Sequence, residues 1–93
     1  MAIQVRLYAT LRAITGERSV AVSDSCTTVR ELVADLISRW PDLAERLYAD
    51  SEDDLRAYVA VMVNGRDVRH LNGLDTELSP ETELDIFPPV AGG

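Results

Sequence analysis

The segment TVRELVADLISRW, residues 28–40, is the strongest determinant of the fold. Its apolar residues recur three or four positions apart, as on one face of a helix. They are Val29, Leu32, Val33, Leu36, Ile37 and Trp40. Thr28 and Glu31 have the spacing of a capping box, in which a Thr oxygen and a Glu carboxylate satisfy free amides at the helix start. Pro41 cannot continue a helix. The sequence therefore predicts one dominant amphipathic helix that ends near Trp40.

The chain before this helix is patterned for two strands. Within residues 2–8 the inward set and the outward set alternate, which is typical of a half-buried strand. The inward set is Ile3, Val5 and Leu7, and the outward set is Gln4, Arg6 and Tyr8. Residues 19–22 predict a second, short strand, and residues 9–17 a helical turn with a loop. Two strands joined in this way predict a hairpin.

The chain after the helix predicts three more strands and small helical turns. A short helix is expected over residues 42–48, then a solvated acidic loop over 49–54. Strands are expected at 56–63, 67–69 and 84–87. Asn64-Gly65 is a strong signal for a tight turn between the first two of them. Residues 71–78 predict a compact connection with a possible helical turn, and residues 79–81 predict a turn.

The order of elements predicts an α+β fold of the β-grasp type. Strands before and after one dominant helix imply a mixed sheet with the helix packed on one face. Residues 1–87 are expected to form this single domain. Residues 88–93 are expected to form a flexible arm, stiffened by Pro88 and Pro89 and ending in Gly92-Gly93.

Composition narrows the possible partners and compartments. The net charge of −7 disfavours binding to nucleic acid or to an anionic membrane, because those surfaces attract basic proteins. No apolar run is long enough to span a membrane, and no secretory signal opens the chain. The single cysteine cannot form an internal disulfide, which fits a reducing compartment. We therefore expect a cytoplasmic protein.

The sequence predicts no autonomous active site. A nucleophilic pair would need Cys26 and His70 in contact, but they are separated in the predicted fold. No Cys or His cluster has metal-ligand spacing, and no glycine-rich phosphate loop is present. We therefore expect no metal and no stably bound cofactor.

The remaining candidate group is a carboxylate at Gly93. Joining it to AMP would create a mixed anhydride with a good leaving group, and a sulfur nucleophile could then displace AMP. Gly92 and Gly93 carry no side chains that would crowd a narrow activating channel. The alternative is a frayed terminus, the commoner fate of chain ends.

The chain resembles the ubiquitin-like sulfur carriers of the MoaD/ThiS group, and the MoaD branch in particular. The resemblance covers the chain in order and length. It is most specific in residues 63–69, 71–78 and 86–93, the last of which reads IFPPVAGG. It implies that Gly93 carries a thiocarboxylate, that Gly92 is its required neighbour and that Phe87 contacts the partner. The departure is an acidic insert over residues 49–55.

The resemblance also implies partners and a pathway. The expected partners are a ubiquitin-activating-type adenylating enzyme, which would use ATP and Mg, and a sulfurtransferase or other sulfur donor. A third is an acceptor such as the large subunit of molybdopterin synthase. The insert resembles carriers for cysteine synthesis or tRNA thiolation and archaeal modifiers, so those pathways stay open. Two functions besides sulfur transfer also stay open, namely a protein modifier joined through Gly93 and a non-covalent binding module.

A docking surface is expected beside the arm. Four side chains point away from the inward sets of their strands and should share the sheet face opposite the helix. They are Tyr8, Ala60, Met62 and Phe87. A contiguous apolar patch marks an interface, and the arm residues Pro88, Val90 and Ala91 are expected to add further partner contacts.

Overall fold

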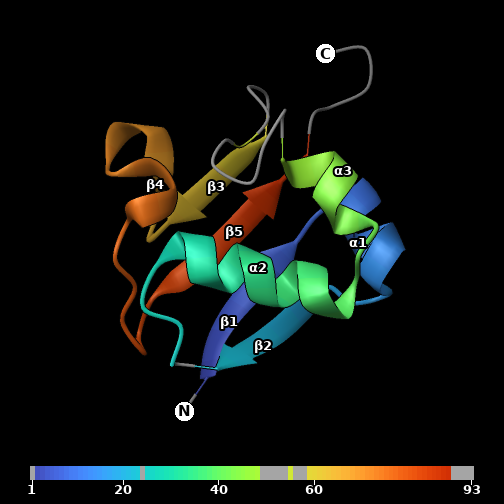
Figure 1. Cartoon of the computed structure of the whole chain (residues 1–93), viewed down its shortest axis with the longest axis horizontal. Helices are drawn as coiled ribbons and strands as arrows, with labels where there is room; N and C mark the ends of the chain where they lie inside the picture. Colours follow the sequence, from blue (N-terminus) through green and yellow to red (C-terminus); the bar gives the residue numbers. More distant parts are fainter. Residues whose placement is uncertain (1, 24, 49–54, 56–58, 89–93) are drawn as a thin grey trace.

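A five-stranded mixed sheet forms one layer of the protein, in the strand order β2-β1-β5-β3-β4 (Figure 1). The computed structural model describes residues 2–23, 25–48, 55 and 59–88. The strands are β1 Ala2–Leu7, β2 Ser19–Ser23, β3 Ala60–Val63, β4 Arg66–Asp67 and β5 Glu83–Phe87. The central β1 and β5 run parallel, while the other neighbours run antiparallel. The predicted hairpin and mixed sheet are confirmed.

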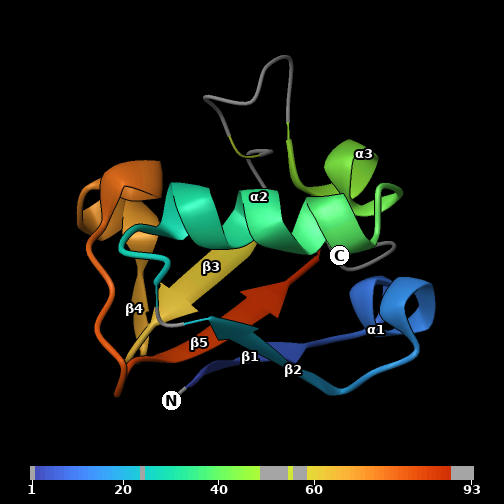
Figure 2. The same ribbon diagram turned by 60° about the horizontal axis from the view of Figure 1, so that its bottom comes forward.

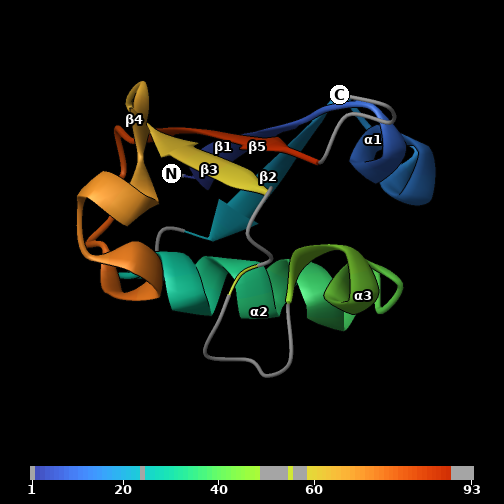
Figure 3. The ribbon, with the colours of Figure 1, turned by 90° about the horizontal axis from the view of Figure 1, so that it is seen from above.

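Helix α2, Val29–Arg39, crosses one face of the sheet and forms the second layer (Figure 3). The Thr28 hydroxyl oxygen accepts a hydrogen bond from the Glu31 amide at 3.3 Å, as predicted. The Glu31 carboxylate, however, accepts from the amide and hydroxyl of Thr27 at 2.7 and 2.8 Å, one residue earlier than in a regular capping box. These bonds lower the pKa of Glu31. The start of α2 therefore carries a charge-assisted cap.

The core lies between α2 and the sheet. The alternating residues of the central strands point into it, as the sequence predicts, and α2 contributes one apolar face. These buried residues are Ile3, Val5, Leu7, Val20, Val22, Val59, Val61, Val63, Leu84 and Ile86 from the sheet side and Val29, Leu32, Val33 and Leu36 from α2. The outer face of the sheet is thereby left to the opposite set of side chains.

Shorter helices close the ends of the two layers (Figure 2). They are α1 Thr10–Thr15, α3 Leu43–Leu47 and the 3₁₀ turns η1 Val68–His70 and η2 Gly73–Asp75. The helical turns predicted in residues 9–17, 42–48 and 71–78 are confirmed. Leu11, Leu43 and Leu47 are fully buried, so α1 and α3 extend the core beyond α2.

The strand predicted over residues 67–69 is wrong in extent. Strand β4 ends at Asp67, and the chain turns into η1. The reason is local, since the Asp67 carboxylate accepts a hydrogen bond from the Arg69 amide at 2.9 Å and caps that turn. Val68 is buried at the start of η1. The cap formed by the Asp67 side chain thus favours a 3₁₀ turn over continuation of strand β4.

The Asn64-Gly65 turn joins β3 to β4 as predicted. Both residues have positive φ, 50° and 85°, which is the requirement of the type I′ hairpin turn. The Asn64 side-chain oxygen also accepts from the Glu83 amide at 2.8 Å, and the Asn64 amide donates to the Glu83 carbonyl at 2.8 Å. The turn therefore ties the start of β5 to the hairpin. Of the strand predicted over 56–63, residues 56–58 lie outside the described part.

Candidate docking face and carrier tail

Strand β5 leads from the centre of the sheet directly into the tail. Its register against β3 pairs Phe87 with Ala60 and Asp85 with Met62. Residues 89–93 lie outside the described part of the chain. The roles predicted for Val90, Ala91, Gly92 and Gly93 therefore stay predictions, and the described site is the sheet face from which the tail leaves.

Two aromatic rings meet at the end of β5. The rings of Tyr8 and Phe87 stack with their centroids 4.3 Å apart and an interplanar angle of 16°. Phe87 is 38% exposed, and among the described residues it is one of two exposed large apolar side chains, the other being Leu71. The prediction that Tyr8 and Phe87 lie outside the core and close together is confirmed. They form a flat apolar platform.

A charged network holds one ring of this platform in place. The Tyr8 hydroxyl donates to the Asp85 carboxylate at 2.8 Å. Arg6 forms a bidentate ion pair with the same carboxylate, with Nε at 2.6 Å and Nη2 at 3.0 Å from its oxygens. The Asp85 side chain is only 13% exposed, so its charge is largely withdrawn from water and needs these partners.

The network shifts the protonation of its donors. The hydrogen bond to Asp85 raises the pKa of Tyr8, with burial adding to the effect. Hydrogen bonding to the same carboxylate, together with its charge, raises the pKa of Arg6. Both groups therefore keep their protons at neutral pH and continue to donate. Tyr8 is held by its hydroxyl at one end and by ring stacking along its side.

Ala60 and Met62 lie on the same face, both partly exposed. Ala60 faces Phe87 in the register and extends the platform across β3, whereas Met62 faces Asp85. The Arg6–Asp85 pair therefore separates Met62 from Tyr8. The predicted patch is present as a row of Tyr8, Phe87 and Ala60, which we call the platform. Met62 lies outside this row, beside the charged Asp85.

Pro88 departs from the expectation that it belongs to a free arm. It is buried, so its ring packs with the folded body and offers little surface to a partner in the free protein. The reason is its position, because it follows Phe87 at the end of β5 and points to the opposite side of the sheet. The exposed contact at this point is Phe87.

The sequence pattern did not reveal Arg6 and Asp85 as a pair. Each was only an outward-facing residue of its strand. Their contact follows from the parallel register, in which Arg6 lies opposite Asp85. The sequence shows one charged residue on the outer face of each central strand. These charges indicate an ion pair only once the register of β1 against β5 is known.

Cys26 and His70 take no part in this site. Cys26 is half-buried just before α2, and burial, with the nearby charges of Asp35 and Glu31, raises the pKa of its thiol. A raised pKa disfavours the thiolate that a nucleophile requires. His70 lies exposed in η1.

The described residues offer neither a metal site nor a membrane-spanning helix. No group of three or more His, Cys, Asp or Glu side chains among them is arranged to hold a metal ion. None of the helices in that part of the chain is long and apolar enough to cross a membrane.

The fold and the tail-bearing face place the chain in a defined class. Its five-stranded mixed sheet and the main helix packed on one face define the ubiquitin-like β-grasp fold. The ThiS family model matches residues 5–93, and the chain belongs to the ThiS family of ubiquitin-like sulfur carriers.

Individual relatives agree with this class. Small archaeal modifier protein 3 of Haloferax volcanii is 37% identical over the full length of both chains. The Amycolatopsis orientalis BexX/CysO complex contains a chain that is 36% identical, with a TM-score of 0.84 over 99% of this chain and 100% of the other. Small archaeal modifier protein 1 of Methanosarcina acetivorans is 30% identical, with a TM-score of 0.83 over 99% and 96%.

Proposed function

We propose that this protein is a sulfur carrier whose reactive group is the Gly93 carboxylate. The observation that carries the proposal is the family match, which extends through residue 93 and so includes the Gly92-Gly93 ending. The platform at the end of β5 supports it, because an exposed aromatic ring stands directly before the tail.

The chemistry belongs to the tail and to partner enzymes. A ubiquitin-activating-type enzyme joins the Gly93 carboxylate to the AMP of ATP and releases pyrophosphate, with Mg on the nucleotide. Sulfide, or its equivalent from a sulfurtransferase, then attacks the carbonyl carbon, and AMP leaves as the carbon–oxygen bond breaks. The product is a thiocarboxylate. Its sulfur bonds to an acceptor carbon to form a thioester, and water then attacks the carrier's carbonyl carbon, so that the sulfur stays on the acceptor and the carrier returns as a carboxylate. The carrier is a co-substrate in this cycle.

The platform positions the tail for this reaction. The partner enzyme contacts the rings of Phe87 and Tyr8 while Gly92 and Gly93 enter its activating channel. Because the Arg6–Asp85–Tyr8 network is satisfied within the chain, the rings are in place before the partner arrives. Preorganisation of this kind reduces the ordering cost of binding.

The acceptor that we propose first is the large subunit of a molybdopterin synthase, on the FPPVAGG ending of residues 87–93. The likeness to the chain in the BexX/CysO complex supports an acceptor of another class. Incubation of the thiocarboxylated carrier with each candidate acceptor decides between them. If the carrier loses its sulfur only when one acceptor and its substrate are present, that acceptor is the partner. If the carrier keeps its sulfur with every candidate acceptor, both assignments are wrong.

Mass spectrometry tests the carrier chemistry directly. Protein purified from its own host under sulfur-replete conditions should contain a fraction heavier by about 16 Da, the mass gained when sulfur replaces one oxygen. Fragmentation should place the gain on Gly93. Deletion of Gly92-Gly93 provides the control. If no such fraction forms and the cognate enzyme does not adenylate the chain, the proposal is wrong.

A second function, protein modification through Gly93, is supported by the 37% identity to small archaeal modifier protein 3. It shares the adenylation step, after which a target lysine amine replaces sulfur as the nucleophile. This chain contains no lysine. Conjugates would therefore carry one copy at each target lysine, without lysine-linked chains of the modifier itself. A ladder of conjugates that disappears without Gly92-Gly93 supports this function, whereas a purely free pool contradicts it.

A further inference from the structure

Strand β5 ends at Phe87 although it lies at the centre of the sheet, between β1 and β3 (Figure 1). A central strand has a neighbour on each side, so it can form main-chain hydrogen bonds on both sides. Pro88 and Pro89 follow Phe87. Proline has no N–H, and within sheets it is confined to edge strands, strand starts and bulges. The two prolines therefore stand where a central strand stops.

Successive residues of β5 turn their main-chain groups to opposite neighbours. The Asn64 amide donates to the Glu83 carbonyl at 2.8 Å, so Glu83 faces β3. The register then turns Asp85 and Phe87 to β3 as well, because main-chain direction alternates along a strand. The next position of this set is residue 89. Pro89 lies outside the described residues, but as a proline it has no N–H to donate toward β3.

The other set of β5 residues, which includes Ile86 and Pro88, faces β1. On β1, the Leu7 amide donates to the Arg18 carbonyl at 2.8 Å, just before β2, so the next residue, Tyr8, turns its main-chain groups to β5. Because Leu7 pairs with Ile86 in the parallel register, an N–H at position 88 would point toward the Tyr8 carbonyl. Pro88 removes that donor.

The Tyr8 carbonyl could accept a further bond. It accepts from the Leu11 amide at 3.1 Å, at a turn in which Ala9 has a φ of 51°, but a carbonyl oxygen has two lone pairs. The rings of Tyr8 and Phe87 stack with centroids 4.3 Å apart, so β1 and β5 are still side by side at this level. An acceptor is thus present beside position 88, and the missing N–H prevents a further main-chain bond.

We propose that Pro88 and Pro89 act together as a two-sided stop for β5, which keeps the arm of residues 88–93 from pairing with the sheet. One proline would leave one neighbour open, because adjacent residues face opposite sides. The consequence for activation rests on the proposed function. Pairing of residues 88 and 89 would shorten the free arm by about 7 Å, at roughly 3.3–3.6 Å per residue. Gly93 would then fall short of the activating channel.

The fixed φ of proline also stiffens a chain, and the two effects predict opposite results when N–H groups are restored. If Pro88 and Pro89 only stiffen the arm, valines in their place give a looser arm whose amides are unprotected. If the prolines stop β5, valines extend it, because Val favours strands. Protection of the restored amides therefore distinguishes a stop from a stiffener.

Hydrogen–deuterium exchange of the double variant Pro88→Val/Pro89→Val tests the stop without any partner enzyme. Both restored amides should exchange about tenfold more slowly than in an unstructured peptide of the same sequence, as expected for two added main-chain bonds. Exchange at the peptide rate at either position overturns the proposal. If the double variant does not fold, Pro89→Val alone decides, because it keeps the buried Pro88. Its restored amide should exchange about threefold more slowly, and the peptide rate overturns the stop.

ATP–pyrophosphate exchange by the cognate adenylating enzyme then connects the stop to activation. The half-saturating concentration of the double variant should rise by about the factor by which its amides are protected, because only the unpaired fraction can bind. Pro80→Val is the matched control, since Pro80 is exposed in the turn before β5 and should leave this concentration unchanged.

The two measurements separate this proposal from the proposed function. Protected amides with an unchanged half-saturating concentration would overturn the connection to activation. A wild-type protein that the adenylating enzyme does not activate would contradict the proposed function, and the protection of the restored amides would still decide whether Pro88 and Pro89 stop β5.

Discussion

Replacing Phe87 by Ala should separate docking from folding. The ring lies at the end of β5, beside the tail, and remains 38% exposed although it stacks on Tyr8. Its substitution removes the most exposed part of the platform and leaves the buried residues of β5 in place. We therefore expect a large loss of affinity for the adenylating enzyme and a small loss of stability.

Typical energies of aromatic contacts set both magnitudes. An aromatic pair contributes about 1 kcal/mol beyond the area it buries, and a loss of that size lowers the melting temperature of a domain this small by roughly 4–8 °C. An aromatic anchor at the centre of an interface is worth about 2 kcal/mol or more. That corresponds to a loss of roughly thirtyfold in affinity.

ATP–pyrophosphate exchange by the cognate adenylating enzyme, measured over a range of carrier concentrations, gives the affinity. Circular dichroism at the assay temperature establishes that each variant is folded. Leu71→Ala is the matched control, because Leu71 is 37% exposed but follows η1, away from β5. It should change the half-saturating concentration by less than about twofold.

Two results would refute this reasoning. One is an equal effect of Phe87→Ala and Leu71→Ala on exchange. The other is a Phe87→Ala protein that is mostly unfolded while its folded fraction is activated normally, which would make Phe87 a core residue.

Three further predictions concern the tail, the Asp85 network and the helix cap. Gly92→Val should fold with an unchanged melting temperature yet fail in pyrophosphate exchange, because a β-branched side chain obstructs the activating channel; normal exchange contradicts this. The stabilisation from the raised pKa of Tyr8 is present below its ordinary pKa of about 10 and is lost as pH rises through the folded value. Asp85→Asn should therefore lower that pKa in an ultraviolet titration, and an unchanged curve would rule out the network. The lowered pKa of Glu31 stabilises the fold above its ordinary value of 4.5, and this gain is lost as pH falls through the folded value. Glu31→Gln should lower the melting temperature at pH 7 with a difference that shrinks in acid; a pH-independent difference would show that the bonds to Thr27 do not need the charge.

Local patterns in the sequence specified the elements and their faces. Alternation in residues 2–8 and 84–87 placed Tyr8 and Phe87 outside the core, and the three- and four-residue spacing after Thr28 defined the face of α2. Asn64-Gly65 specified its turn because both positions require positive φ. Each of these patterns depends on residues only a few positions apart, where backbone geometry and side-chain direction are directly coupled.

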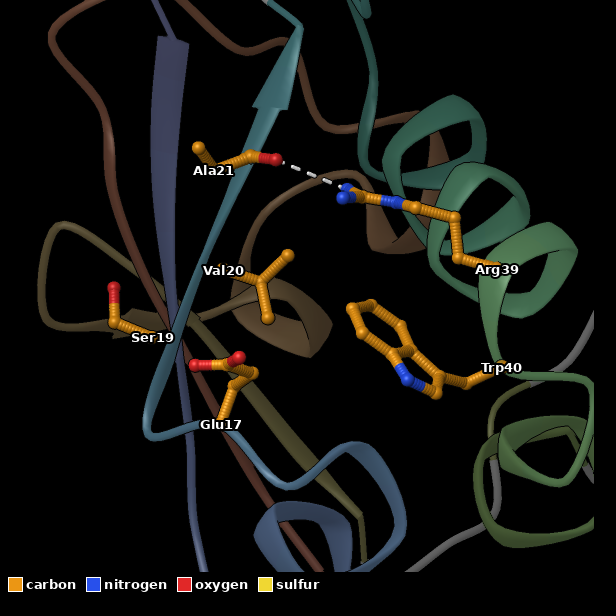
Figure 4. A pocket seen from close by; sticks show the side chains of 6 residues that line it. All are labelled: Glu17, Ser19, Val20, Ala21, Arg39 and Trp40. Atoms are coloured by element: carbon orange, nitrogen blue, oxygen red, sulfur yellow. Dashed lines mark hydrogen bonds between the residues drawn. The ribbon is translucent and has the colours of Figure 1, made fainter.

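Which outward-facing residues meet was settled only by the assembled fold. Arg6 and Asp85 are 79 positions apart, and Tyr8 and Asp85 are 77 apart, so their contacts depend on the parallel pairing of β1 with β5. The pocket between Val20 of β2 and Trp40 after α2 likewise exists only because α2 returns across the sheet to the edge strand (Figure 4). A local pattern specifies which face a side chain takes but carries no information about strand order or register. Those are settled when the whole core closes, since burying the inward residues of all strands against one helix selects a single arrangement.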